Sequence, residues 1–507
     1  MFSSGSLFSK DDLSQIVDRG SDPVVVHQQI ERFKKGFPFA ELVEPATLKR
    51  GITLFNEEEK AEWIACFDRQ RKSQKICRFV PASGAATRMF KSLFELSDAL
   101  KGKSAAEQEQ IIRHDDEART FFDSLSDYPF YPDLSLQGYE SPLEVLDSLL
   151  LEEGLNYGLL PKGLLKFHRY GEQSRTAFEE HLHEAARMGE PGEEVMLHFT
   201  VSEEHLNGFK QLEKLLVPLL EKHYGTVFNI TYSFQKAETD TIAVDKQNRP
   251  LRDETGKLVF RPGGHGALLQ NLNDLEHDVV FVNNIDNISP DRNSEIRVRH
   301  KKMLGGLLMR IRNEAEELLS RLNAGAEAGA VESAADWLVE TAGRQLPDNF
   351  EEWSPKEQVS WLISSINKPV RVCGMVKNEG EPGGGPFFVR DSESEVSPQI
   401  VESSQVDFSD QQQSEIFRRS SHFNPVDMAC SLRSAGGESY DLTSFVDSNT
   451  GFISEKSVRG KALRALELPG LWNGSMAGWI TVFVEVPAET FTPVKTIFDL
   501  VRPAHIS

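Results

Sequence analysis

The stretch "RFVPASGAATRMFK", residues 78–91, predicts a short buried strand that runs into a loop and then, at Thr87 and Arg88, into a helix. The loop consists of small residues, namely Ser83, Gly84, Ala85 and Ala86. In α/β proteins, ligands bind beyond the carboxyl ends of the strands, where free N–H groups at the start of a helix attract an anion. A tight turn from strand to helix would explain the same residues about equally well.

This loop is not one of the common nucleotide-binding motifs. Its glycine spacing fits neither a Walker phosphate loop nor a dinucleotide fingerprint. Arg88 nevertheless adds a forked guanidinium group, which suits phosphate. The loop is therefore a candidate anion site that needs support from the rest of the chain.

Apolar runs that recur along the chain predict the fold class. They predict strands at residues 76–80, 194–201, 228–234, 278–284, 369–376 and 479–486. Each run is apolar enough for a central strand that is buried on both faces. Helical patterns lie between them, at residues 174–188, 203–224 and 299–323. This alternation favours an α/β fold with a mixed, mostly parallel sheet flanked by helices.

A chain of 507 residues is too long for one ordinary core, so we expect a large domain with additions, or two domains. Residues 1–70 look like a helical N-terminal extension, and residues 71–430 look like the α/β domain, with a helical insertion at about 92–160. Residues 431–507 would complete that domain. Within it, residues 241–264 predict a hairpin that turns at residues 254–256.

Composition excludes several classes of protein. The formal net charge of −22 disfavours a broad contact with nucleic acid or with an anionic membrane, although a local basic pocket stays possible. No apolar run approaches 18 residues, and the N-terminus has no signal-peptide pattern. The four cysteines are scattered and form no CxxC, which argues against a zinc site or a disulfide framework. We therefore expect a cytoplasmic protein.

Three further motifs carry residues with chemical potential. Lys162 stands in "LLPKGLLKFH", although a single lysine in a loop is usually solvated. His265 is surrounded by glycines in "FRPGGHGALL", where a turn that closes the preceding hairpin is an equally good explanation. Asp286 follows a buried strand in "VVFVNNIDNISPD". Oxygen-bearing side chains at that position suit Mg²⁺, but a turn with Asx hydrogen bonds would use the same residues.

Taken together, these motifs resemble the sugar-nucleotide pyrophosphorylases, in particular the eukaryotic-type UTP–glucose-1-phosphate uridylyltransferases and the UDP-N-acetylhexosamine pyrophosphorylases. The resemblance is carried by five motifs in order: "SGAATRM", "LPKG", "PGGHGAL", "VNNIDN" and "VPAETFTPVKTIFDL". "PQIVESSQVD" and "SSHFNPVD" are more loosely similar to sugar-side segments of that family. The chain is also identified as a member of a bacterial family described as a domain of unknown function (4301).

The resemblance implies a Rossmann-like nucleotidyltransferase fold of the GT-A type, a nucleoside triphosphate, a sugar 1-phosphate and Mg²⁺. It implies catalytic roles for Arg88, Lys162 and Lys495, and a metal-binding role for Asp286. The residues that it implies for substrate and nucleotide binding are Ser83, Gly84, Ala85, Thr87, Gln235, Gly263, Gly264, His265, Glu402 and Asn424. The expected reaction transfers a nucleotidyl group, uridylyl by the resemblance, to the sugar 1-phosphate and releases pyrophosphate.

The chain departs from the family pattern at two places. Ala85 and Ala86 stand where the family is richer in glycine, and a long insertion separates Arg88 from Lys162. Two alternatives therefore stay open. One is a sugar-nucleotide-binding protein that has lost turnover, and the other is a glycosyltransferase that uses a nucleotide sugar. A binding protein would show nucleotide affinity without pyrophosphate release, and a glycosyltransferase would not need both Lys162 and Lys495.

Overall fold

The computed structural model describes residues 7–84, 86–325, 328–380, 383–458 and 461–506. The chain divides into two compact units, and each draws on separate parts of the sequence. The first unit comprises residues 1–76, 235–281 and 303–486, and the second comprises residues 77–234, 282–302 and 487–507. These divisions cut across the expected parts 1–70, 71–430 and 431–507.

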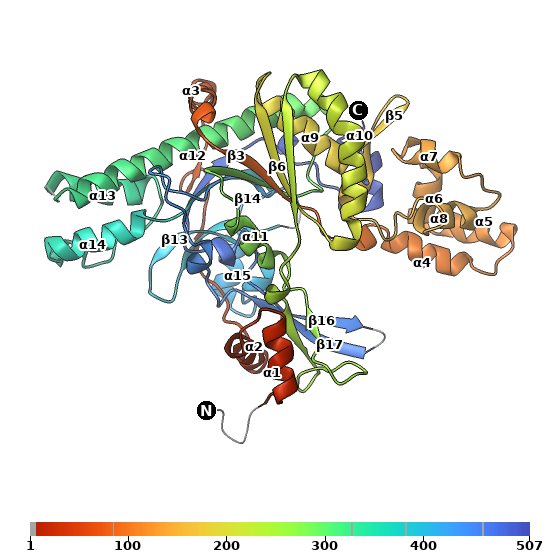
Figure 1. The fold of residues 1–507 in the computed structure, drawn as a ribbon, viewed down its shortest axis with the longest axis horizontal. Helices are drawn as coiled ribbons and strands as arrows, with labels where there is room; N and C mark the ends of the chain where they lie inside the picture. Colours follow the sequence, from red (N-terminus) through yellow and green to blue (C-terminus); the bar gives the residue numbers. More distant parts are fainter. Residues whose placement is uncertain (1–6, 85, 326–327, 381–382, 459–460, 507) are drawn as a thin grey trace. The chain divides into compact units, whose positions relative to one another are not determined.

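The second unit contains the strand predicted by the opening stretch. β3 (Ile76–Pro81), β6 (Glu194–Thr200) and β7 (Val227–Ser233) form parallel pairs in that order. Two helices pack against them, α9 (Ala177–Met188) and α10 (Leu206–Tyr224), as Figure 1 shows. Gly225 follows the last residue of α10, and its φ of +68° is the left-handed conformation typical of a helix C-terminus. The prediction that β7 is a central strand was wrong, because β7 is a half-exposed edge strand.

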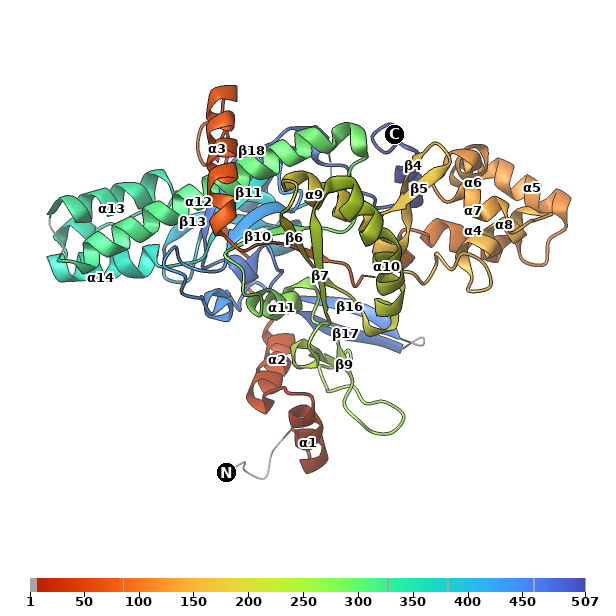
Figure 2. The same ribbon diagram turned by 45° about the horizontal axis from the view of Figure 1, so that its top comes forward.

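The segment between the opening loop and Lys162 is helical. It forms α4 (Lys91–Leu100), α5 (Ala105–His114), α6 (Asp116–Asp123), α7 (Tyr131–Ser135) and α8 (Pro142–Leu150). Figures 1 and 2 show these helices gathered in one group, drawn in orange. A hairpin follows, made of β4 (Lys166–Tyr170) and β5 (Gln173–Thr176). The insertion therefore leaves the sheet after β3 and returns to it through α9 and β6.

The first unit has its own part of the mixed sheet. β2 (Ile52–Thr53), β18 (Ile480–Glu485) and β11 (Val370–Lys377) pair in parallel, while β15 (Asp427–Ser431) and β14 (His422–Phe423) pair with β11 in the antiparallel sense. β10 (Val279–Asn283), with all five residues buried, begins in the first unit and ends in the second. Four of the six pairings described in the two parts are parallel, so the predicted α/β fold with a mostly parallel sheet is confirmed.

Smaller sheets and the remaining helices complete the first unit. One sheet joins β1 (Glu41–Pro45), β12 (Gly385–Arg390) and β13 (Val396–Val401), and the other joins β16 (Phe452–Val458), β17 (Lys461–Glu467), β8 (Thr241–Val244) and β9 (Phe260–Arg261). The hairpin is confirmed, because Arg252 pairs with Leu258 and Gly256 has a φ of +82°. The helices of this unit are α1 (Lys10–Asp18), α2 (Pro23–Lys35), α3 (Glu57–Gln70), α11 (Leu269–Asn273), α13 (Ala328–Glu340), α14 (Pro355–Ile366) and α15 (Gln411–Arg418).

One long helix, α12 (Ser294–Asn323), passes from the second unit into the first. Its far part runs beside α13 and α14 in both views (Figures 1 and 2). No helix in the described part of the chain has the length and the apolar character needed to cross a membrane. All four cysteines are buried free thiols.

A buried carboxylate holds the second unit together. Glu184 of α9 is 3% exposed and forms ion pairs with Arg78 of β3 and with two cations of α12, Arg297 at 2.5 Å and Lys301 at 3.1 Å. Burial by itself would raise the pKa of Glu184, but the charges of Arg297, Lys301 and Arg78 hold it well below its usual range. Arg297 also donates to the carbonyl oxygens of Asn287 and Thr490. The cluster therefore fixes the segments after β10 and β18.

We expect Glu184→Gln to destabilise the second unit by about 3–5 kcal/mol, because the substitution leaves three buried cations without their carboxylate. Tryptophan fluorescence would not report on this unit, because all tryptophans lie in the first unit. Amide hydrogen exchange resolved by peptide is therefore the suitable measurement. Glu179→Gln, on the same helix but partly exposed, is the control. Equal protection of β3 and α9 in the two variants would contradict the expectation.

The lowered pKa of Glu184 predicts that the second unit loses stability at acidic pH. Its folded-state pKa is depressed, so its contribution to stability is present above about pH 4.3, the usual pKa of a glutamate, and is lost as the pH falls through the folded-state value. The loss of protection of α9 between neutral pH and about pH 3 should therefore be smaller in Glu184→Gln than in the natural chain.

Candidate active site

Two predicted lysines of the second unit donate to one oxygen of a third predicted residue, Asp286. Lys162 Nζ donates to Asp286 Oδ2 at 2.6 Å, and Lys495 Nζ donates to the same oxygen at 3.1 Å. Lys162 Nζ also donates to the carbonyl oxygen of Val494 at 2.6 Å. Two ammonium groups share one carboxylate oxygen, and the charge of Asp499 also acts on Lys162. An anion would therefore be held by the N–H donors that the two lysines leave unused.

Backbone pairing brings these distant residues together. The loop after β10 and the segment before Lys495 form an antiparallel bridge between Asn287 and Pro493. The amide of Val494 donates to the carbonyl of Asp286 at 2.9 Å, and the amide of Thr492 donates to the side chain of Asn287 at 3.0 Å. The asparagine-rich run therefore does form a hydrogen-bonded loop, and that loop presents Asp286 to both lysines.

The three side chains differ in their access to solvent. Asp286 and Lys162 have side chains only 11% and 16% exposed, whereas that of Lys495 is 53% exposed. Burial by itself would raise the pKa of Asp286, but the charges of Lys162 and Lys495 lower it overall. Burial lowers the pKa of Lys162, and Asp286 opposes that shift. Lys162 is thus not the solvated lysine that its loop position would suggest, and Lys495 leads from the cluster to solvent.

The opening loop is fastened beside both lysines. The amide of Ala86 donates to the carbonyl of Leu160 at 3.2 Å, and the amide of Ile497 donates to the carbonyl of Met89 at 3.2 Å. These contacts lie two residues from Lys162 and two residues from Lys495. The chain forms a single 3₁₀ turn at Ala86–Arg88, and α4 begins only at Lys91.

Gly84 separates the two explanations of this loop. A Cβ on Gly84 would meet no atom of the described residues within 4 Å, and the φ of Gly84 does not lie in the left-handed region. Neither packing nor backbone conformation therefore requires glycine at this position. The backbone at Gly84 is open to approach, as a ligand-binding loop requires, and its role in binding stays a prediction.

The other predicted residues of the loop are placed as follows. Ser83 is half-buried, Thr87 and Arg88 are exposed, and Ala85 lies outside the described residues. Arg88 forms no ion pair with any described residue. An exposed, unpaired guanidinium group in this loop is available to an anion.

The predicted nucleoside residues belong to the first unit. A Cβ on Gly263 would lie 2.6 Å from the carbonyl oxygen of Thr239, and Gly264 has a φ of +78°. Packing and conformation thus explain these two glycines without a ligand. His265 stacks on Trp472, with ring centroids 4.1 Å apart, and its Nδ1 accepts from the amide of Leu471 at 3.0 Å. Because Nδ1 accepts, the proton of the neutral ring is on Nε2.

Burial lowers the pKa of His265 to about 4, so the ring is neutral at pH 7 and Nε2 acts as a hydrogen-bond donor. Trp472 also bonds to Glu402, a predicted sugar contact, and burial raises the pKa of this carboxyl group. His265 and Glu402 therefore share Trp472 as a neighbour, and sequence reasoning missed this tryptophan. The only signal for Trp472 was an aromatic residue between the turns of "LPGLWNGSM".

Two predicted contacts already have partners within the chain. The side-chain amide of Gln235 donates to Asp240 at 3.0 Å. Asn424 uses both ends of its amide on the backbone, since Nδ2 donates to the carbonyl of Gly374 at 3.1 Å and Oδ1 accepts from the amide of Val426 at 3.1 Å. These bonds explain both side chains structurally, and their predicted roles in binding stay predictions.

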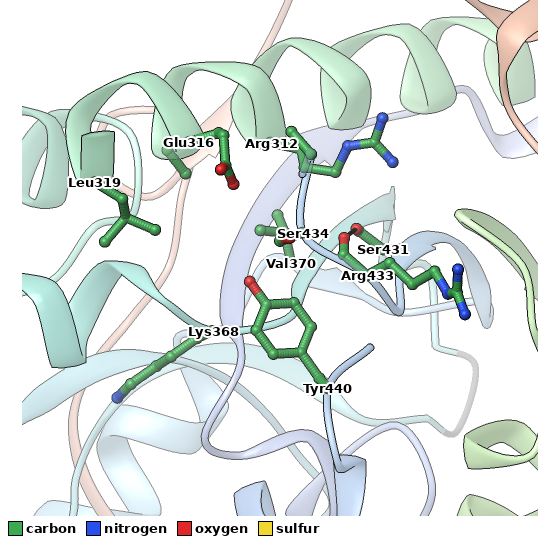
Figure 3. A pocket seen from close by; sticks show the side chains of 11 residues that line it. Arg312, Glu316, Leu319, Lys368, Val370, Ser431, Arg433, Ser434 and Tyr440 are labelled. Atoms are coloured by element: carbon green, nitrogen blue, oxygen red, sulfur yellow. Dashed lines mark hydrogen bonds between the residues drawn. The ribbon is translucent and has the colours of Figure 1, made fainter. Parts of the chain in front are cut away.

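A separate hollow in the first unit contains none of the predicted residues. It lies between α12 and the loop after β15, and its lining includes Arg312, Glu316, Lys368, Arg433 and Tyr440 (Figure 3). In Figure 3 the hydroxyl of Tyr440 points into the hollow, whereas the charged ends of Lys368 and Arg433 point away from it. The cationic groups do not converge there, so we place the candidate site at Asp286.

The metal-binding capacity of the described residues is small. They contain no group of three or more His, Cys, Asp or Glu side chains that could hold a metal ion. Asp286 offers one carboxylate, and both ammonium groups lie on its Oδ2. Mg²⁺ commonly takes one or two carboxylates and completes its shell with phosphates and water. Asp286 therefore fits Mg²⁺ only as one ligand among several from a bound substrate.

The chain is similar to solved structures of two sugar-nucleotide pyrophosphorylases. One is the uridine diphosphate N-acetylglucosamine pyrophosphorylase from Trypanosoma brucei, at 12% identity and a TM-score of 0.49, covering 99% of this chain and 80% of that chain. The other is a mutant UDP-glucose pyrophosphorylase from Leishmania major, at 13% identity and a TM-score of 0.45, covering 98% and 79%.

No curated protein matches the chain. Residues 9–506, which are nearly the whole chain, match one protein family. Because that match covers far more than half of the sequence, the chain belongs to the family described as a domain of unknown function (DUF4301).

Proposed function

We propose that this chain is a sugar-1-phosphate nucleotidyltransferase with a GT-A-type, Rossmann-like fold. The observation that carries the proposal is the meeting of Lys162, Asp286 and Lys495, with the opening loop hydrogen-bonded to the segments that carry the two lysines. In the proposed reaction, an oxygen of the sugar 1-phosphate attacks the α-phosphorus of a nucleoside triphosphate. A P–O bond forms, the bond between the α-phosphorus and the bridging oxygen breaks, and pyrophosphate leaves with the electron pair.

This reaction needs charge neutralisation and alignment more than proton transfer. The attacking phosphate oxygen is already anionic at pH 7, so no general base is required. Each lysine ammonium group has three N–H donors. Lys162 uses two of them in the described contacts and Lys495 uses one on a carboxylate, so both retain donors for phosphate oxygens.

The two lysines would act on different phosphates. Lys162, mostly buried, would hold the α-phosphate and the leaving pyrophosphate, where a desolvated charge is most effective. Lys495, half-exposed, would hold the sugar phosphate as it arrives from solvent. Arg88 and the backbone of the opening loop, at Ser83, Gly84 and Thr87, would bind the triphosphate.

Magnesium is part of the proposal. Asp286 would contribute one ligand, and Mg²⁺ would supply additional neutralisation of the phosphate charge. Asp286 accepts hydrogen bonds from both lysines on Oδ2. If the lysines donated to substrate phosphates instead, the negative charge of Asp286 would become available to the cation. The uridylyl group and the nucleoside, base and sugar contacts at Gln235, Gly263, Gly264, His265, Glu402 and Asn424 stay predictions, because the proposal rests on the second unit.

We expect Lys162→Met to lower kcat for pyrophosphate release about a hundredfold, because it removes one preorganised positive charge from the transition state. The measurement is pyrophosphate release across a grid of nucleoside triphosphates and sugar 1-phosphates, with Mg²⁺ present. Lys166→Met is a matched control, since Lys166 lies four residues away and pairs with Asp133. A change below about threefold in Lys162→Met would contradict the assigned role.

We expect Asp286→Asn to raise the Mg²⁺ concentration needed for half-maximal rate by about tenfold or more, because an amide is a much weaker ligand for a hard cation than a carboxylate. Binding of the nucleoside triphosphate, titrated calorimetrically with and without Mg²⁺, gives a second readout. An unchanged Mg²⁺ dependence in both measurements would show that Asp286 serves only to pair the lysines.

The same grid separates the alternatives. Nucleotide binding without pyrophosphate release for any pair of substrates would favour a sugar-nucleotide-binding protein without turnover. Transfer or hydrolysis of a nucleotide sugar, again without pyrophosphate, would favour a glycosyltransferase.

A further inference from the structure

A chain of buried polar side chains lies in the second unit, outside the candidate site. Nδ1 of His168, on β4, lies 2.9 Å from Oε1 of Glu180, on α9. Nε2 of His168 lies 3.0 Å from Nδ1 of His505. The three residues are 0%, 2% and 3% exposed, respectively. Burying three such groups is costly unless their hydrogen bonds are all made, so the pattern of donors and acceptors can be worked out.

The carboxylate end of this chain is an acceptor. Tyr170 donates its hydroxyl proton to Oε1 of Glu180 at 2.7 Å, and Arg175 donates to Oε2 at 3.4 Å. Both contacts require acceptor oxygens. Nδ1 of His168 must therefore carry a proton and donate it to Glu180.

The other end of the chain reaches the backbone beside Lys495. His505 hydrogen-bonds to the backbone of Pro493. Proline has no N–H, so the carbonyl accepts and the His505 ring donates. Nδ1 of His505 already faces His168, so the donor to Pro493 is Nε2. Burial lowers the pKa of His505 to about 3, so this ring is neutral and its Nδ1 is an acceptor.

These contacts run in one direction through the protein. Nδ1 of His168 donates to Glu180, and Nε2 of His168 shares a hydrogen bond with Nδ1 of His505. The result is an unbroken series of directed bonds from α9 to the carbonyl of Pro493.

Pro493 belongs to the segment that carries the site. The next carbonyl, of Val494, accepts from Lys162, and the amide of Lys495 donates to Asp499 Oδ2 at 2.8 Å. Asp499 and Arg502 also act on His505, because the charge of Asp499 raises its pKa and that of Arg502 lowers it. Movement of Pro493 would therefore move both contacts of the lysines with Asp286.

We propose that His168 is a positioning residue. With Glu180 and His505 it forms a buried strap that fixes residues 493–499, and thereby the side chain of Lys495, against Asp286. The inference rests on the role of Lys495 given under the proposed function, but the strap itself is measurable without activity.

The test compares His168→Phe with His183→Phe. Phenylalanine removes the ring nitrogens but keeps a planar ring, and Glu180 retains Tyr170 and Arg175. His183 is a matched control, because it is a buried histidine on α9 that bonds to Tyr224 instead. His505→Ala is a second strap variant, because it removes the ring that joins His168 to the backbone of Pro493.

Two readouts are expected to respond. Amide exchange of residues 493–499 should become about tenfold faster in His168→Phe and His505→Ala, because a buried hydrogen-bond network is lost. The KM for the sugar 1-phosphate should rise about tenfold in both, with a much smaller change in KM for the nucleoside triphosphate. A merely structural defect would lower the amount of active protein and leave both KM values unchanged.

The outcomes are distinct. Exchange at residues 493–499 that matches the His183→Phe control in both strap variants would overturn the proposal. A uniform loss of rate with unchanged KM values would also overturn it. If the natural chain releases no pyrophosphate, the proposed function fails, and the exchange measurement alone decides whether His168 positions the segment.

Discussion

The buried charge of Glu184 is the constraint on which the second unit depends. A carboxylate in an apolar interior is stable only when cations surround it, and here the cations come from β3 and α12. Arg297 then donates its remaining N–H groups to the carbonyls of Asn287 and Thr490. The satisfaction of one buried charge thus sets the positions of the two backbone segments that carry Asp286 and Lys495. Four residues before Glu184 on the same helix face, Glu180 anchors the histidine strap.

The two carboxylate clusters of this unit differ in what they can do. Glu184 is enclosed, and the side chains of Arg297 and Lys301 around it are 0% exposed. Asp286 is paired as closely, but one of its lysines is 53% exposed and keeps free donors. Charge that is enclosed stabilises the fold, whereas charge that borders solvent with unused donors is available to a ligand. The difference in access, and not the residue types, separates structural from candidate catalytic charge.

Glycines illustrate why motif matching alone was ambiguous. Gly84 and Gly263 both occur in motifs of small residues that precede a helical turn. In the structure, the carbonyl of Thr239 requires glycine at position 263, whereas none of the residues that the structure describes crowds Gly84. A sequence shows that a side chain is missing, but the space that its absence leaves is filled or left open by residues far away in the chain. Sequence reasoning therefore predicted the loop, and only the packing favoured ligand binding for one glycine and structure for the other.

The sequence by itself determined several strands and helices of the α/β fold and named the residues of the candidate site. Apolar runs and helical periodicity are local properties, so β3, β6, β10, α9 and α10 could be predicted, and so could Lys162, Asp286 and Lys495 as residues of interest. Only the tertiary structure decided which of these residues meet. Val494, which accepts from Lys162, is 332 residues away from it in the chain, and no local pattern encodes such a pairing. His168, His505 and Trp472 escaped prediction for the same reason, because each looks ordinary until a distant segment supplies its partner.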